Sequence, residues 1–458
     1  MTTTSGLTAT DPATFDSAAP GAPVEHADPT FPSLHVRPPR GWVNDPNGVA
    51  LIDGTYHVFF QHNPDDPLHD AIRWGHASSH DLLHWSEEPI ALAPRPGELD
   101  SHGCWTGTVI DDGGVPTAVY SAVADTSGRS AVLLARSDRT LRTWVQERTP
   151  VAGMPDDPAI TDVRDPFLFE FEGHRYAIQG AGRRGGTPSI LLYACDDLER
   201  WSELGTLLNG EHPVASEHAQ ADIWECPNLV HLDGRWILIV SLWRWVQGKH
   251  ALTGVAHLVG DLVRDGASLR FEPTSGGAVD DGPAFYAPQV LALPERALLW
   301  AWSWELGRSQ EQVAQAGWAG VLTFPRELYL DNGHLASRPA DELSRLRGAA
   351  LPWHNGSGFT ARAFEATGTG PAQLLLGDGQ GERLVVEVGS DRGVDAGHSE
   401  HQQEQEPWRI LVDGSLVEVF AGPTPTTTRA YPSSDSSWVL RAAQPGQVRV
   451  HRLELPED

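Results

Sequence analysis

The sequence predicts an all-β protein, with a five-bladed β-propeller followed by a C-terminal β-sandwich. Three observations support this prediction. A unit of about 60 residues recurs five times between residues 31 and 335. Within it, short strand-like runs alternate with turns rich in Gly, Pro and Asp, and helical patterns are scarce. A second series of alternating strand patterns follows a charged segment near residue 340.

Each repeated unit contains a polar turn followed by an aromatic or aliphatic run, as in Asp53–Phe60. Turns of the same kind begin at Asp112, Glu172, Asp233 and Glu295. Seven to nine residues before the five turns stand Asp45, Trp105, Asp165, Glu225 and Tyr286, spaced by 60, 60, 60 and 61 residues. Because the units of a propeller surround a common axis, we expect these five side chains to converge there.

The chain divides into four segments. Residues 1–30 lack periodicity and predict a disordered tail, residues 31–335 form the propeller, 336–352 a linker and 353–458 the sandwich. Within the sandwich, two strand patterns flank Asp413-Gly414, which is a strong hairpin signal. The polar stretch at 397–406 is expected to be an exposed loop. Three tryptophans at the ends of propeller units are expected to pack between sheets: Trp85, Trp144 and Trp201.

Charge and cysteine content restrict the functional classes. The chain has 458 residues and a net charge of −28, which argues against nucleic acids and anionic membranes as partners. No apolar run is long enough to cross a membrane. Cys104, Cys195 and Cys226 show no paired spacing, so we expect no disulfide. The N-terminus lacks the pattern of a secretory signal, which favours a cytoplasmic protein. The sequence predicts no particular oligomeric state.

Three carboxylates in phase predict chemistry on a glycosidic bond. Its cleavage passes through an oxocarbenium-like state that one carboxylate traps and one carboxylic acid assists. Crowding of Asp45, Asp165 and Glu225 would keep one of them protonated near neutral pH. Proline lies just behind four of the five converging residues, which indicates innermost strands whose ends line an opening. The spacing alone does not assign a role to each carboxylate.

Several motifs together resemble glycoside hydrolase family 32, the invertase, levanase and inulinase family. They are Trp-Val-Asn-Asp-Pro-Asn-Gly at 42–48, Arg-Asp-Pro at 164–166 and Glu-Cys-Pro at 225–227, with Asp-Gly-Ser-Leu-Val-Glu-Val-Phe at 413–420 in the C-terminal part. The resemblance covers about residues 33 to 455. It departs from the common pattern at Val43 and at Cys104–Gly107.

The resemblance implies a retaining β-fructofuranosidase acting on sucrose and fructo-oligosaccharides through a covalent fructosyl-enzyme. In it, Asp45 is the nucleophile, Glu225 the general acid and base, and Asp165 stabilises the transition state. The substrate-binding residues expected from the resemblance and from the repeat are Asn44, Gln61, Trp74, Trp105, Thr106, Arg164 and Tyr286. Cys226 is expected to tune the acid rather than to react.

Other hypotheses remain open. A fructosyltransferase would use the same three carboxylates, an inverting arabinan-type hydrolase would need them farther apart, and a fructan-binding propeller would need no catalysis. We expect neither a metal nor a cofactor. The spacing of His76, His80 and His84 would suit a metal only on a helix, and this stretch has a strand-and-turn pattern.

Overall fold

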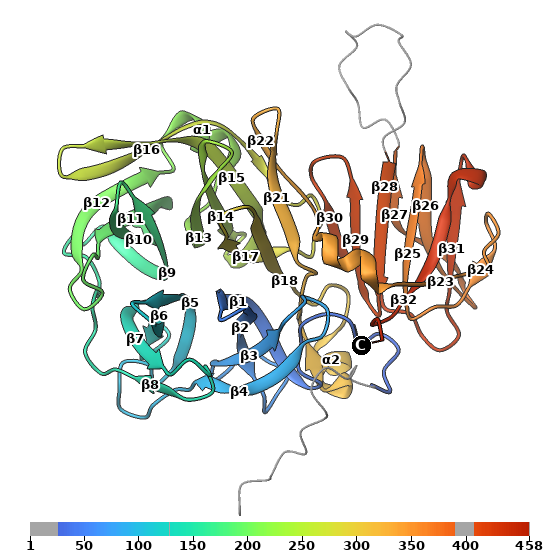
Figure 1. Cartoon of the computed structure of the whole chain (residues 1–458), viewed down its shortest axis with the longest axis horizontal. Coiled ribbons are helices and arrows are strands. Elements are labelled where there is room, and N and C mark those ends of the chain that lie inside the picture. Colours follow the sequence, from blue (N-terminus) through green and yellow to red (C-terminus); the bar gives the residue numbers. More distant parts are fainter. Residues whose placement is uncertain (1–25, 128, 390–406, 458) are drawn as a thin grey trace, which may run out of the picture.

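The structure is a computed structural model that describes residues 26–127, 129–389 and 407–457. Figure 1 shows two β-rich parts side by side: a ring of strands from the N-terminal part and a sandwich of strands from the C-terminal part. In the described residues, none of the helices is long and apolar enough to span a membrane. The β-propeller and β-sandwich predicted from the sequence are therefore confirmed.

The propeller strands follow one another in antiparallel groups of four. The first two groups are β1 (Gly41–Ile52), β2 (Thr55–Asn63), β3 (Arg73–Ser79), β4 (Ser86–Leu92), and β5 (Gly103–Asp112), β6 (Val115–Val123), β7 (Ala131–Ser137), β8 (Trp144–Gln146). The next two are β9 (Ile160–Phe171), β10 (His174–Arg183), β11 (Thr187–Ala194), β12 (Ser202–Asn209), and β13 (Ile223–Leu232), β14 (Arg235–Val246), β15 (Lys249–Asp265), β16 (Ser268–Ala278).

The last group comprises β17 (Tyr286–Ala292), β18 (Ala297–Ser303), β21 (Arg326–Asp331) and β22 (His334–Pro339), with the short β20 (Val321–Leu322) beside β18. β19 (Trp318–Ala319) pairs in parallel with β1 and so joins the end of the ring to its beginning. Two short helices, α1 (Pro213–His218) and α2 (Gln310–Ala316), lie in connections. A single pairing of Gly182 with Ile223 links the third and fourth groups into one eight-stranded sheet, so five separate blades remain a prediction.

The innermost strand of every group carries a break in its pairing register at the same place. The breaks lie between Val43 and Pro46, Cys104 and Gly107, Arg164 and Phe167, Glu225 and Asn228, and Tyr286 and Gln289. Such β-bulges leave residues without ladder hydrogen bonds and re-aim their side chains, which is why proline is tolerated there. Figure 1 shows these strands, β1, β5, β9, β13 and β17, around the middle of the ring.

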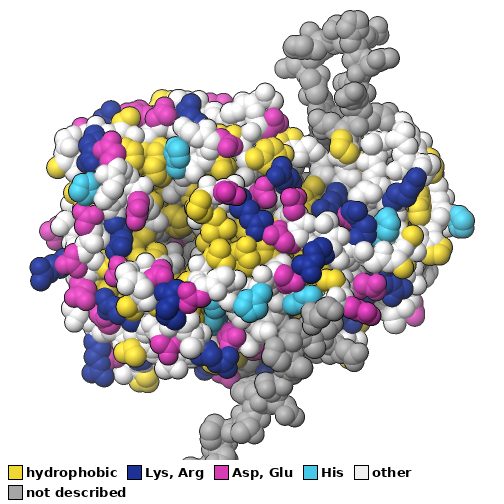
Figure 2. All heavy atoms as spheres, viewed as in Figure 1, with side chains coloured by type: hydrophobic (Ala, Val, Ile, Leu, Met, Phe, Trp, Pro, Cys, Tyr) yellow, Lys and Arg dark blue, Asp and Glu magenta, His cyan; other side chains and the backbone are white. Residues whose placement is uncertain are grey.

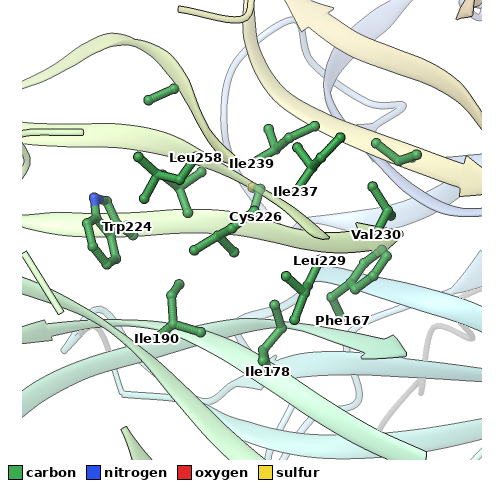
Figure 3. Packing of buried hydrophobic residues seen from close by; sticks show 14 of the residues in the cluster. Phe167, Ile178, Ile190, Trp224, Cys226, Leu229, Val230, Ile237, Ile239 and Leu258 are labelled. Carbon is green, nitrogen blue, oxygen red and sulfur yellow. The ribbon is translucent and has the colours of Figure 1, made fainter. Parts of the chain in front are cut away.

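Apolar side chains fill the space between neighbouring groups. Figure 3 shows Phe167, Ile178 and Ile190 of the third group packed against Leu229 and Ile239 of the fourth. The three tryptophans at the unit ends have a shared structural role, because each indole N–H donates to the carbonyl three residues earlier. The bonds are Trp85 to Leu82, Trp144 to Leu141 and Trp201 to Leu198, at 2.9 to 3.1 Å.

The sandwich consists of two sheets. One contains β23 (Arg347–Ala350), β32 (Arg449–Leu453), β25 (Ala363–Thr369), β28 (Pro407–Asp413), β29 (Leu416–Ala421) and β30 (Thr426–Arg429). The other contains β24 (Gly358–Phe359), β31 (Ser437–Ala442), β26 (Ala372–Asp378) and β27 (Gly381–Val388). The 3₁₀ helices η1 (Asp341–Leu346) and η2 (Pro445–Gln447) complete the elements. The predicted hairpin at Asp413-Gly414 is present, with Asp413 paired to Leu416.

The structure shifts three of the expected segment boundaries. The propeller extends past 335, because β22 continues to Pro339, and the predicted linker at 336–352 contains η1 and the sandwich strand β23. Residues 26–30 of the expected tail are packed: Asp28 accepts a hydrogen bond from the Trp318 indole, and Thr30 accepts one from the Ser415 amide. Residues 1–25 and the predicted loop at 397–406 lie outside the described residues.

A buried polar network joins the two parts. Arg326 of β21 has no exposed surface and donates to Glu418 of β29 and to Asp280 at 2.6 to 3.1 Å. The His35 ring lies between two carboxylates of the sandwich, 2.8 Å from Asp413 and 3.2 Å from Glu418. The motif at 413–420 therefore acts at the contact between the two parts, and its charges are neutralised by partners from the propeller.

Candidate active site

The five bulges bring the predicted residues together at one end of the inner strands. Asp165 and Cys226 have left-handed backbone angles, with φ of 61° and 46°. Residues other than glycine rarely adopt this conformation, and it costs ~1–3 kcal/mol, so it is typical of sites where a side chain must point in a fixed direction. The face of the propeller in Figure 2 is hollowed near the middle of the ring.

Asp45 is held by three neighbours from three different strands. Thr106 donates its hydroxyl to Oδ2 of Asp45 at 2.6 Å, and the side-chain amide of Gln61 donates to the same oxygen at 3.1 Å. Gln61 also donates to the Thr106 hydroxyl at 2.6 Å. The Cys226 thiol lies 3.5 Å from the same Asp45 oxygen. These three contacts all fall on the same carboxylate oxygen of Asp45.

Asp165 and Asp45 share Cys226 as a neighbour. The Cys226 sulfur is 3.5 Å from Oδ2 of each aspartate, so the two oxygens lie within twice that distance of each other. The backbone N–H of Cys226 donates to Asp165 at 2.8 Å, and the backbone N–H of Asp165 donates to Ser121 at 2.8 Å. The thiol contacts the two aspartates rather than Glu225, so its influence falls on them and not directly on the expected acid.

Glu225 receives two hydrogen bonds. Arg164 donates to Oε1 at 3.0 Å and the Tyr286 hydroxyl donates to Oε2 at 2.8 Å. Arg164 is also paired with Asp162 at 3.0 Å and lies over the Trp105 ring, 5.7 Å from its centre. Both donors stabilise a negative charge on Glu225 and fix the position of its carboxylate. Tyr286 is thus a neighbour of the carboxylates, as the repeat predicted.

Burial and mutual repulsion determine the ionisation of the cluster. Burial, and then the negative charge of Glu225, raise the pKa of Asp45 to about 7 and that of Asp165 to about 8. Burial and the nearby carboxylates raise the pKa of the Cys226 thiol well above its usual range, so it stays protonated and unreactive. Burial therefore keeps protons on Asp45 and Asp165 at higher pH than in water.

The other predicted binding residues occupy two layers. Trp105 is partly exposed, and its indole N–H is buried without a partner, as are Oδ1 of Asn44 and Nε of Arg164. Unsatisfied polar atoms of this kind suit the hydroxyl groups of a sugar. Trp74 has no exposed surface and donates to the Trp105 carbonyl at 3.0 Å. The structure therefore places Trp74 in the core, where it holds the backbone of Trp105, and not on an open wall.

Two further residues of the site were not among the predicted binding residues. Trp302 of β18 packs edge-on against Trp42, with ring centres 6.3 Å apart, and its indole N–H is also buried without a partner. Its register partner is Tyr286, so it belongs to the same inner end of the last unit. Ser121 supports Asp165 from the preceding unit. Only the repeat phase could have indicated Ser121, because a single serine in a strand carries no signal.

Carboxylates clustered at the inner ends of propeller strands are the arrangement that a glycosidase needs. Comparison with known proteins specifies which. Residues 35–339 match the Glycosyl hydrolases family 32 N-terminal domain, and residues 379–455 match the Glycosyl hydrolases family 32 C-terminal domain. The first match alone covers more than half of the chain. The chain belongs to glycoside hydrolase family 32.

Individual relatives span nearly the whole chain. The sucrose-6-phosphate hydrolase of Salmonella typhimurium is 30% identical over 455 residues, which are 95% of this chain and 96% of that protein. The raffinose invertase of Escherichia coli is 28% identical over 449 residues, 89% of this chain and 90% of that protein. The structure of the Bombyx mori GH32 beta-fructofuranosidase BmSUC1 has a TM-score of 0.74 at 25% identity, covering 94% of this chain and 95% of that one.

Proposed function

We propose that this protein is a retaining β-fructofuranosidase that releases terminal, non-reducing β-D-fructofuranosyl units from sucrose and fructo-oligosaccharides. The proposal rests on the closeness of the three carboxyl groups. Asp45 and Asp165 both lie against the Cys226 thiol, and Glu225 is the residue that precedes Cys226. The similar proteins include an invertase and a sucrose-6-phosphate hydrolase, which supports a substrate of this class.

Each carboxylate has a distinct place in the proposed reaction. Asp45 attacks C2 of the fructosyl unit while Glu225 protonates the departing oxygen, and a covalent fructosyl-enzyme forms. Glu225 then removes a proton from water, which attacks C2 and releases fructose with its configuration retained. Asp165, fixed by the Cys226 and Ser121 contacts, binds fructose hydroxyls and stabilises the positive charge that develops on the ring.

The raised pKa values bear on the start of the reaction. Attack needs Asp45 ionised, and a pKa of about 7 leaves part of the Asp45 population in that form near neutral pH. Arg164 and Tyr286 hold the Glu225 carboxyl group in place for the proton transfer.

Incubation of the purified protein with sucrose, 1-kestose, inulin and levan tests the proposal, with Asp45→Ala as the control. We expect release of fructose by the wild type and its loss in the variant. NMR of the first-formed anomer separates retention from the inversion of an arabinan-type hydrolase. No sugar release from any of the four substrates would contradict hydrolysis and favour a fructan-binding protein.

A fructosyltransferase would form the same covalent intermediate and pass fructose to a sugar instead of water. Product analysis at high sucrose concentration distinguishes the two, because a transferase yields mainly tri- and tetrasaccharides. The role of Glu225 has its own test. Glu225→Gln is expected to reduce rates most for substrates with poor leaving groups and least for activated ones. Equal losses across leaving groups would exclude Glu225 as the acid.

The remaining parts of the proposal concern binding partners and cellular location. A net charge of −28 suits a small neutral carbohydrate and does not suit nucleic acids or anionic membranes as partners. The cytoplasmic location expected from the sequence stays a prediction, which fractionation of cells expressing the full chain would test.

A further inference from the structure

A long hairpin extends from the fourth propeller unit beyond the catalytic residues. Glu225 on β13 pairs with Ser241 on β14, and Ile223 near the start of β13 pairs with Trp243. β14 continues to Val246 before the chain turns back into β15. The end of this hairpin, which we call the β14–β15 arm (residues 243–250), therefore projects past the strand end that carries Glu225.

The arm exposes an aromatic surface. Trp245 is 60% exposed, more than any other tryptophan among the described residues. The Trp243 ring is stacked on His250, with centres 5.1 Å apart and planes 20° apart, and Trp245 meets Trp243 edge-on at 5.0 Å. Three clustered rings, one of them largely exposed, form an apolar surface of the kind that marks a binding site.

The aromatic surface is fixed to the site. Asp222, three residues before Glu225, accepts a hydrogen bond from the Trp245 amide at 2.7 Å, and its own amide donates to the Trp243 carbonyl at 2.9 Å. Alternate residues of a strand share a face, so Trp243 and Trp245 lie on the face of Ser241. The Ser241 hydroxyl accepts from the amide of Ala287, next to Tyr286, so this face is the one directed towards the last unit.

Distance along the strand indicates which sugar meets the arm. Trp245 is four positions beyond Ser241, the register partner of Glu225, which is ~13 Å at the usual rise of a strand. The acid marks the oxygen between the fructosyl unit and the leaving group. A ring of the leaving group lies next to that oxygen, so Trp245 is far enough away to meet the ring after it.

We propose that Trp245, supported by Trp243 and His250, is a stacking platform for the second sugar on the leaving-group side of the bond that is cleaved. The inference rests on the proposed function and specifies its substrate class, fructo-oligosaccharides of three or more units. Sucrose has a single sugar in its leaving group and does not reach the platform, whereas 1-kestose has two. The apolar face of a sugar ring packs against the indole, with dispersion and burial of apolar surface as the attractive forces.

Kinetics with sucrose, 1-kestose and nystose test the platform. Trp245→Ala is expected to lower kcat/KM for 1-kestose and nystose about tenfold, ~1.4 kcal/mol, mainly through KM, and to change sucrose less than about twofold. Trp245→Phe, which keeps a ring, is expected to restore most of the loss. Val246→Ala is the matched control, because Val246 is 45% exposed on the same arm and points to its other face.

Three results would overturn the platform: equal losses for sucrose and 1-kestose, no loss in Trp245→Ala, or the same loss in Val246→Ala. Lys249→Ala, at the turn of the arm, tests whether charge rather than a ring accounts for binding, and a selective loss there also overturns it. Calorimetry in the Asp45→Ala background gives a readout that needs no catalysis. There, addition of Trp245→Ala is expected to weaken 1-kestose binding about tenfold; if it does not, the platform is wrong even if hydrolysis is established.

Discussion

The Thr106 hydroxyl lowers the pKa of Asp45 against the effect of burial, and its removal has a calculable effect. Thr106 donates to Oδ2 of Asp45 at 2.6 Å, and this bond is the largest influence that opposes burial on the Asp45 pKa. A hydrogen bond to a charged group contributes ~1.5–3 kcal/mol, which corresponds to about 1 to 2 in pKa. Thr106→Val keeps the shape and removes the donor, so the pKa of Asp45 is expected to rise from about 7 by that amount.

The consequence is a shift in the pH dependence of the reaction. Attack requires ionised Asp45, so kcat/KM for sucrose rises with pH through the Asp45 pKa. At about pH 6 the variant is expected to lose roughly 10- to 100-fold in kcat/KM, because the ionised fraction falls tenfold for each pH unit below the pKa. The loss shrinks as the pH approaches 9 or so. The measurement is the profile of kcat/KM from about pH 5 to 9 for both proteins.

Thr108→Val is the matched control for this experiment. Thr108 lies on the same strand and is 7% exposed, but it is not among the hydrogen-bond partners of Asp45. Its substitution should leave the inflection in place. An unchanged inflection in Thr106→Val, or a uniform loss at every pH, would refute the reasoning that the hydroxyl acts through the charge of Asp45.

Two further predictions concern stability. Because the pKa of Asp165 is raised to about 8 in the folded state, the folded protein keeps a proton that the unfolded chain loses near pH 4. The free energy of unfolding therefore falls between about pH 4 and 8, by ~1.4 kcal/mol per pH unit. Asp165→Asn is expected to raise the urea midpoint at about pH 8 and not at about pH 4; the same gain at both would contradict a charge effect. Arg326→Met leaves Glu418 and Asp280 buried without their cation and is expected to cost ~3–5 kcal/mol in urea unfolding. Arg139 forms an exposed ion pair with Asp53 and Asp111, so Arg139→Met should leave the urea midpoint almost unchanged; equal losses in the two variants would show that burial is irrelevant.

The convergence of the site residues could be predicted from the sequence because the propeller fold requires repeated units of similar length. Units of equal length place equivalent residues at the same height around the ring, so spacing alone brought Asp45, Asp165 and Glu225 together. The bulges were not predicted, although their prolines were visible, because Asp-Pro and Cys-Pro indicate a turn as readily as a bulge. Contacts between distant segments were also out of reach: His35 and Asp413 are 378 residues apart, and no local pattern pairs them.

Side-chain burial limited the prediction in a different way. Trp74 and Trp105 carry the same local signal, yet one is fully buried and the other lines the site, since only the packing of two units decides which ring lies in front. The β14–β15 arm was not anticipated either. Its residues continue a strand pattern. The exposure of Trp245 depends on the number of residues by which β14 extends beyond its last partner in β13, and the sequence pattern does not indicate that number.

Asp165 has a structural task as well as a chemical one. Three bulge residues with left-handed backbone angles, Asp165, Cys226 and Ala287, each donate their amide to a side chain. The amides of Asp165 and Ala287 donate to the hydroxyls of Ser121 and Ser241, at 2.8 and 3.1 Å. The amide of Cys226 donates to the Asp165 carboxylate at 2.8 Å, so the residue that fixes the bulge beside Glu225 is itself one of the three carboxylates.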